Sequence, residues 1–182
     1  PKDARALLAT CRNNGCELRI LDGAVKANQE ICAYLVNRMK HQMGSLKGRT
    51  IGVLGLAYKP FTDDVRESRA IDMVRLLLDE GAIVQAHDPA ANEAAAEALQ
   101  HENFHLTSDA CEAASGADAV AVLTEWNEFR NLDLGELKRA MKGDVLLDAR
   151  NIFDPDAAVE HGFVYLGRGR SPKLRREVAV AN

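Results

Sequence analysis

The 182-residue sequence has few aromatic residues, 5% of the chain, and no excess of basic residues, because 23 Lys and Arg stand against 27 Asp and Glu. None of its apolar runs approaches the roughly 18 residues that a membrane-spanning helix requires. A dedicated nucleic-acid-binding protein usually carries a basic excess, whereas the formal net charge here is −4. The composition therefore argues against nucleic-acid and membrane partners.

The cysteines lack C-x-x-C spacing, and the N-terminal segment lacks the apolar core of a secretory signal. We interpret the cysteines as reduced and mostly packed thiols of a cytoplasmic protein. They are Cys11, Cys16, Cys32 and Cys111.

Hydrophobic periodicity predicts two helices within residues 1–47. The first spans residues 3–13 and stops at the signal Asn13-Asn14-Gly15. The second is one amphipathic helix over residues 20–44, about 36 Å long. A helix of this length before a domain usually links domains or packs against a partner subunit. If the helix packs against a second copy of the chain, we expect Ile31 and Leu35 in the interface of the homodimer.

From Gly48 onward, short apolar segments alternate with helical segments of roughly 10–15 residues. This alternation is typical of βαβ units, and right-handed crossovers then give an α/β fold with a Rossmann-like, doubly wound parallel sheet. The domain is predicted over 48–167 and a basic, flexible tail over 168–182. The predicted strands are 50–55, 82–88, 105–106, 117–123, 144–148 and 163–166, and the predicted helices are 68–80, 91–99, 134–141 and one beginning at Asp109.

The first predicted strand contains Gly52 and Gly55, and Asp88 closes the second. This arrangement is similar to a dinucleotide-binding fingerprint but has only two glycines, and a ten-residue loop separates the strand from its helix. One interpretation is a nucleotide site with a modified loop. The other is that Gly55 only allows the helix and strand to pack closely.

The loop over 58–67 follows the first strand, at the sheet edge where open α/β folds bind ligands. Lys59 and Arg66 could hold a phosphate, or the loop could be a solvated turn with internal ion pairs. Arg150 follows another strand and is expected to face the same crevice as Lys59, favouring an anionic ligand. Alternatively, Arg150 pairs with Asp148 or Asp154.

A third pattern, H-E-x-x-H, comprises His101, Glu102 and His105. A zinc peptidase needs both histidines on one helix face, whereas His105 falls in an extended segment. We therefore expect no metal site here.

Three longer stretches resemble the nucleotide-sugar-binding domain of the UDP-glucose 6-dehydrogenases, in the UDP-glucose/GDP-mannose dehydrogenase family. They are Ile51-Gly-Val-Leu-Gly-Leu-Ala-Tyr-Lys-Pro-Phe-Thr-Asp-Asp-Val-Arg-Glu-Ser68, Leu123-Thr-Glu-Trp-Asn-Glu-Phe129 and Asp148-Ala-Arg-Asn-Ile-Phe-Asp154. Pro1-Lys2-Asp3 is similar to the residues that follow the family's nucleophilic cysteine. The resemblance runs to about Gly167.

The resemblance implies an NAD-dependent oxidoreductase of polysaccharide biosynthesis that converts UDP-glucose to UDP-glucuronate in two successive oxidations. It implies that an N-terminal domain binds most of the NAD, and that the helix over 20–44 forms a dimer interface. Carried over by position, Asp3 is the acid/base that assists the hydrolytic water. Lys2 lies near the cofactor, and Arg66 reaches NAD from the other domain.

By the same carry-over, Tyr58 and Lys59 contact the nucleotide sugar and Arg150 approaches it, while the role of Asn151 stays open. The stretch from Thr124 to Trp126 favours UDP-glucose over the alternative, GDP-mannose or another nucleotide sugar. The 182 residues contain neither the NAD domain nor a cysteine before Pro-Lys-Asp, so we expect this chain alone to be inactive. A non-catalytic module that dimerises through its long helix is a further alternative.

Overall fold

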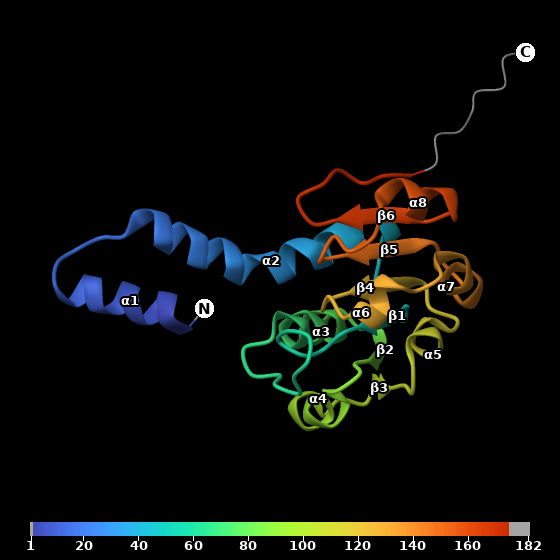
Figure 1. Cartoon of the computed structure of the whole chain (residues 1–182), viewed down its shortest axis with the longest axis horizontal. Coiled ribbons are helices and arrows are strands. Elements are labelled where there is room, and N and C mark those ends of the chain that lie inside the picture. The colour runs from blue at the N-terminus through green and yellow to red at the C-terminus, as the bar shows by residue number, and fades with distance from the viewer. Residues whose placement is uncertain (1, 175–182) are drawn as a thin grey trace, which may run out of the picture.

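The computed structural model describes residues 2–174 and contains a six-stranded, entirely parallel sheet with strand order β3-β2-β1-β4-β5-β6 (Figure 1). This order confirms the predicted Rossmann-like, doubly wound fold. The strands are β1 Thr50–Leu54, β2 Ile83–His87, β3 Phe104–Leu106, β4 Ala119–Val122, β5 Val145–Asp148 and β6 Val164–Gly167.

Helices cover both faces of the sheet, because alternate strand residues point to opposite sides. Val53 belongs to a core shared with α2, α3 and α4, whereas Leu54 belongs to a core shared with α5, α6, α7 and α8. The helices are α1 Lys2–Asn13, α2 Arg19–Met43, α3 Arg69–Asp79, α4 Asn92–Leu99, α5 Ala110–Ala114, α6 Asn127–Arg130, α7 Leu134–Ala140 and α8 Pro155–Glu160. The short helices α6 and α8 were not predicted from the sequence.

The two ends of the long helix α2 differ in how deeply their side chains are buried. Leu35 and Met39 lie in the core of the domain, whereas Ile20 near the other end is 92% exposed. Figure 1 shows that this end projects away from the sheet and that α1 runs back alongside it. The predicted interface residue Leu35 therefore packs within its own chain, and Ile31 packs against the same core. No helix among residues 2–174 has the length and apolarity needed to cross a membrane.

A tight turn joins α1 to α2 at the predicted stop signal. Gly15 has φ +70, and its N–H donates to the carbonyl of Arg12 (3.1 Å). The N–H of Cys16 donates to the carbonyl of Cys11 (2.9 Å). These two bonds define a Schellman motif, in which glycine adopts the left-handed conformation without a Cβ penalty.

The cysteines are free, but the prediction that they are mostly packed is wrong. Cys32 is buried, whereas Cys11 is partly exposed and Cys16 and Cys111 are exposed. The cause is that α1 and the start of α2 lie outside the domain core, and that Cys111 lies on the outer side of the short helix α5.

The predicted tail begins directly after β6. Lys173 forms an isolated antiparallel bridge with Tyr165, through hydrogen bonds of 2.8 and 2.9 Å. Residues 175–182, including the last two basic positions of the predicted tail, lie outside the described residues. Flexibility of this tail stays a prediction.

Candidate functional site

Both glycines of the β1 segment are required by close packing. A Cβ at Gly55, whose φ is +96, would lie 2.5 Å from the Cβ of Thr124. A Cβ at Gly52 would lie 2.6 Å from the carbonyl oxygen of Ala113 on α5. This geometry favours the packing interpretation of the two glycines.

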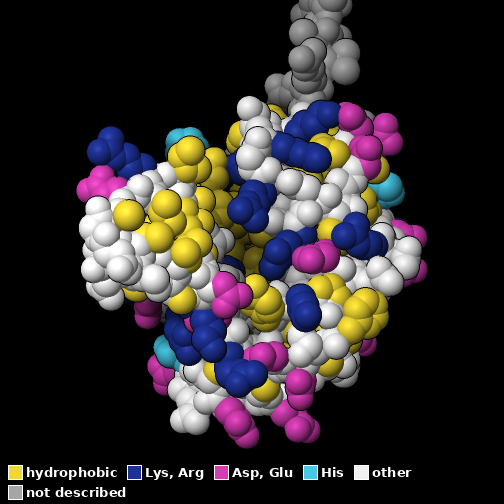
Figure 2. Space-filling model, turned by 60° about the vertical axis from the view of Figure 1, so that its left-hand side comes forward, with side chains coloured by type: hydrophobic (Ala, Val, Ile, Leu, Met, Phe, Trp, Pro, Cys, Tyr) yellow, Lys and Arg dark blue, Asp and Glu magenta, His cyan; other side chains and the backbone are white. Residues whose placement is uncertain are grey.

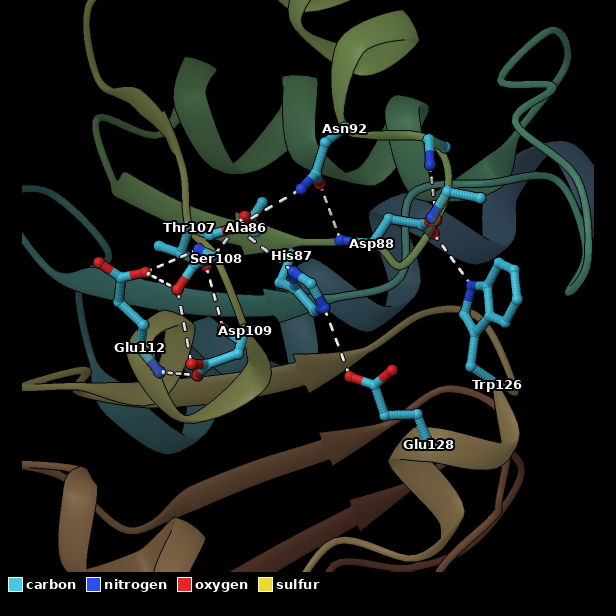
Figure 3. Close-up of polar contacts among 12 residues, drawn as sticks. Ala86, His87, Asp88, Asn92, Thr107, Ser108, Asp109, Glu112, Trp126 and Glu128 are labelled. Atoms are coloured by element: carbon cyan, nitrogen blue, oxygen red, sulfur yellow. Dashed lines mark hydrogen bonds and ion pairs between the residues drawn. The ribbon is translucent and has the colours of Figure 1, made fainter.

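Asp88, directly after β2, organises the loop that follows β1, and Figure 3 shows its contact with Trp126. Its side chain is 1% exposed. One carboxylate oxygen accepts the N–H groups of Leu56 (2.7 Å) and Ala57 (2.9 Å) and the indole N–H of Trp126 (3.1 Å). The other oxygen accepts two backbone N–H groups of its own turn, from Ala90 and Ala91, both at 2.9 Å.

This network closes the position that a dinucleotide uses in other folds of this type. There, the backbone N–H groups after the first strand bind the pyrophosphate and the acid after the second strand binds a ribose. Here Asp88 occupies those N–H groups, and Ser68 caps α3 by accepting the N–H of Ala70. The β1 edge of this domain therefore does not fit NAD held in the usual Rossmann manner.

The charged loop over 58–67 is held by its own ion pair. Arg66 donates to both carboxylate oxygens of Asp64 (2.9 and 2.8 Å), and the N–H of Tyr58 donates to the carbonyl of Asp64 (2.9 Å). Hydrogen bonds from Arg66 lower the pKa of Asp64 to about 2 and raise that of Arg66. Lys59 is exposed and forms no ion pair with an acid among residues 2–174.

Helix α1 meets this loop through an ion pair between Arg5 and Glu67. As a result Lys2 and Asp3, in the first turn of α1, line one cavity together with Tyr58 and Arg66. The structure thus brings together four of the six predicted site residues. Lys2 and Arg66 are more than 60 residues apart in the sequence. The packing of α1 against α2, together with the Arg5–Glu67 ion pair, makes them neighbours.

Arg150 lies in a second part of the same sheet edge. Its Nε donates to the carbonyl of Leu123 (2.6 Å) and lies 3.2 Å from a carboxylate oxygen of Glu125. The backbone N–H of Arg150 donates to Asp148 (3.1 Å), whereas Asp154 caps α8. The side-chain partner of Arg150 is therefore Glu125 and neither of the two aspartates proposed from the sequence.

Asp148 fixes the loop that carries Arg150 much as Asp88 fixes the β1 loop. It is fully buried, and its second oxygen accepts the N–H of Phe153 (2.9 Å) and the hydroxyl of Tyr165 (3.0 Å). Burial, and then the charge of Asp148, raises the pKa of Tyr165 well above its usual range.

Arg150 also lines a cavity of about 540 Å³ with two arginines that sequence reasoning missed, Arg130 of α6 and Arg168 after β6. Oε2 of Glu125 is buried and has the ion-pair contact with Arg150 but no hydrogen bond in the described structure, because the Nε–H of Arg150 donates to Leu123. Oδ1 of Asn151, which also lines this cavity, is buried without a hydrogen-bond partner among the described residues. Arg150 and Arg168 also border a smaller apolar cleft between α2 and α3. Figure 2 shows a hollow beside the helical segment, with hydrophobic side chains inside and Lys and Arg at its rim.

The sequence model described as "UDP-glucose/GDP-mannose dehydrogenase family, UDP binding domain" matches residues 52–155. The chain belongs to this family. It is 40% identical to a UDP-glucose 6-dehydrogenase of Rhizobium meliloti over 171 residues, which cover 93% of the chain and 39% of the relative. It is 36% identical to the UDP-glucose 6-dehydrogenase TuaD of Bacillus subtilis over 175 residues, 96% of the chain and 38% of the relative.

The fold agrees with solved structures of UDP-glucose/GDP-mannose dehydrogenases. A UDP-glucose dehydrogenase from Pyrobaculum islandicum superposes with a TM-score of 0.79 at 34% identity, covering 92% of this chain and 36% of that one. The chain thus spans about two fifths of the length of the curated relatives that it matches.

The residues matched by the family model include four predicted site residues, Tyr58, Lys59, Arg66 and Arg150. Lys2 and Asp3 lie outside the match, so their place in the site rests on the cavity geometry and on the Pro-Lys-Asp resemblance.

The H-E-x-x-H pattern does not form the helical arrangement of a zinc peptidase. His101 lies in the turn after α4, where its Nδ1 accepts the N–H of Asn103 (3.1 Å), and His105 lies on β3. Within residues 2–174, no three His, Cys, Asp or Glu side chains are grouped so that they could hold a metal ion.

Proposed function

We propose that this chain supplies the nucleotide-sugar-binding part of an NAD-dependent UDP-glucose 6-dehydrogenase. Such an enzyme is an oxidoreductase that acts on a CH–OH group and converts UDP-glucose to UDP-glucuronate in the cytoplasm. Family membership and the names of the most similar relatives support this proposal. The structural observation that carries it is the shared cavity of Asp3, Tyr58 and Arg66 at the carboxyl edge of the sheet.

The cationic side chains of this edge suit a ligand with a diphosphate. Lys59 is exposed, and the guanidinium groups of Arg130 and Arg168 make no ion pair with an acid among residues 2–174. We assign Tyr58, Lys59 and Arg150 to the nucleotide sugar, with Arg130 and Arg168 adding positive charge around Arg150. Charge-assisted bonds from such groups to phosphate oxygens are among the stronger hydrogen bonds in proteins.

Asp3 is proposed to act on water. Its carboxylate can accept a proton from a water molecule in the cavity, which activates that water to hydrolyse the acyl intermediate of the second oxidation. NAD supplies the oxidising power of the reaction but does not fit the closed β1 edge of this domain. It would be held by another part of the enzyme, with Lys2 and Arg66 reaching it from the cavity rim.

Two further properties follow from this proposal. Asp88 closes the usual NAD position of this domain, so NAD and UDP-glucose added to this chain alone should give no NADH absorbance. A homodimer through α2 would use the exposed apolar side chains Ile20 and Tyr34, because Leu35 belongs to the core. Sedimentation should show a dimer that is lost in the variant Ile20→Glu, Tyr34→Glu.

Isothermal titration calorimetry with UDP tests ligand recognition. We expect Lys59→Ala to weaken binding by about tenfold, since one charge-assisted hydrogen bond contributes about 1.5 kcal/mol or more. Lys138→Ala is the matched control, because Lys138 lies on α7, away from the 58–67 loop that carries Lys59 (Figure 1). Wild-type protein that binds GDP more tightly than UDP would favour the GDP-mannose alternative. Protein that binds neither nucleotide would contradict recognition by this chain.

A further inference from the structure

Two cysteines stand on either side of the turn between α1 and α2. Cys11 belongs to the last turn of α1, and Cys16 is the third residue after the helix end, at the positions that face each other in a Schellman motif. Side chains at these two positions frequently contact each other. No motif assigns a role to this C-x4-C pair, and the proposed function uses neither residue.

The backbone geometry limits how far apart these two residues can be. The N–H of Cys16 lies 2.9 Å from the carbonyl oxygen of Cys11. With standard bond lengths this places the two Cα atoms at most about 6.8 Å apart. Disulfides form between Cα atoms about 4.4–6.8 Å apart. The separation of the two Cα atoms therefore does not exceed the range in which disulfides form.

The solvent exposure of the thiols also favours Cys11 and Cys16 as the reacting pair. Cys16 is exposed and Cys11 is partly exposed, so a small oxidant can reach both thiols. Cys32 is buried in the core against α3, where its Sγ lies 3.4 Å from the carbonyl oxygen of Arg69. Cys111 is exposed on α5, on the other side of the sheet. The described structure thus offers one pair of accessible thiols held close together by the backbone.

We propose that Cys11 and Cys16 form a reversible disulfide when the protein meets a low-molecular-weight disulfide such as oxidised glutathione. The thiolate of Cys16 attacks one sulfur of glutathione disulfide, which releases one glutathione thiolate and leaves a mixed disulfide. The thiolate of Cys11 then attacks the Cys16 sulfur and releases the second glutathione. The two cysteines lose two electrons and two protons, and glutathione disulfide is reduced to two molecules of glutathione.

This bond would fix the turn that sets the direction of α1. Within the described residues, α1 is held to the rest of the chain by one buried side chain, Leu8, and by ion pairs of Arg12 with Asp22 and of Arg5 with Glu67. Oxidation would therefore restrict the movement of the helix that carries Asp3 toward the cavity. This consequence for the site rests on the proposed function, whereas formation of the disulfide does not.

The sequence gives a direct assay, because trypsin cuts after Arg5, Arg12 and Arg19 and so separates the two cysteines. Folded protein is treated with oxidised glutathione, its remaining thiols are blocked, and it is digested without reductant. We expect the peptides 6–12 and 13–19 to appear joined, at two hydrogen masses below their sum. Cys111→Ser should leave this product unchanged, and Cys16→Ser should abolish it.

Folding is tested by repeating the oxidation in concentrated urea, where the Schellman motif is lost. We expect the joined peptides to form at least tenfold more slowly there. The proposal is overturned if folded protein gives only glutathione adducts on the two cysteines, or if the pair closes equally fast in urea. Because the readout is a peptide mass, this outcome is independent of whether the chain binds UDP.

Discussion

Replacing Asp88 by Asn should destabilise the protein far more than a typical Asp-to-Asn change. The carboxylate accepts five N–H donors, three on one oxygen and two on the other. An amide retains one acceptor oxygen and turns an NH2 group toward the donors on the other side. At about 1.5–3 kcal/mol for each charge-assisted bond, the loss of two or three bonds corresponds to about 3–9 kcal/mol of unfolding free energy.

Two variants calibrate this value in urea unfolding followed by circular dichroism. Trp126→Phe removes one donor to Asp88 and should cost about 1–2 kcal/mol. Asp154→Asn is the matched control, because Asp154 also accepts two backbone N–H groups but at an exposed helix start, where Asn caps nearly as well as Asp. It should cost less than about 0.5 kcal/mol.

Native-state hydrogen exchange adds a local readout. The amides of Leu56 and Ala57 should exchange much faster in Asp88→Asn than in wild-type protein, because they lose their buried acceptor. A total cost below about 1 kcal/mol would refute the reasoning, as would an equal cost for Asp154→Asn. Either result would mean that the β1 loop keeps its conformation without the carboxylate.

Two further predictions concern pH. Burial raises the pKa of Asp118, but the N–H of Thr50 and two nearby cations outweigh it and lower the pKa overall. The Asp118 carboxylate therefore stabilises the protein above the unfolded pKa, and this contribution is lost as the pH falls through the folded pKa. Between about pH 5 and pH 2, wild-type protein should lose more stability than Asp118→Asn. Equal losses in the two proteins would contradict this. The raised pKa of Tyr165 has the opposite effect on the pH dependence, so wild-type stability should fall above about pH 10. Tyr165→Phe lacks the bond to Asp148 and should cost about 1–2 kcal/mol of unfolding free energy at neutral pH. This variant should not show the alkaline decline. Chemical unfolding across the two pH ranges measures both, and a steeper alkaline decline in Tyr165→Phe would exclude this role for the hydroxyl.

Local signals in the sequence were sufficient for most of the sheet. A short apolar run bounded by glycines predicted β1, a longer apolar run over 117–123 predicted β4, and Ser68 marked the start of α3, which it caps in the structure. The two missed helices, α6 and α8, have four and six residues, too few to show a hydrophobic period. Asp154 before Pro155 was nevertheless a readable start signal for α8, because proline favours the first helical position.

The site was less predictable, because its decisive contacts join residues far apart in the chain. Asp88 resembled a ribose-binding acid, yet its partners Leu56 and Ala57 lie about 30 residues earlier and turn the carboxylate inward. No motif marked Arg130, which is an isolated cation in the sequence, and Arg168 was predicted only as the first residue of the basic tail. The neighbourhood of Asp3 and Tyr58 depends on how α1 folds back along α2, which residue spacing does not encode.

Because α2 is one unbroken helix, a small change in its direction moves its exposed end by a large distance. The helix has 25 residues and is therefore about 37 Å long. A tilt of five degrees at its buried end would move the far end by about 3 Å, roughly the length of a hydrogen bond. Because the Gly15 turn joins α1 to that exposed end, any surface that binds the far end of α2 would also act on the helix that carries Asp3 back toward the domain (Figure 1).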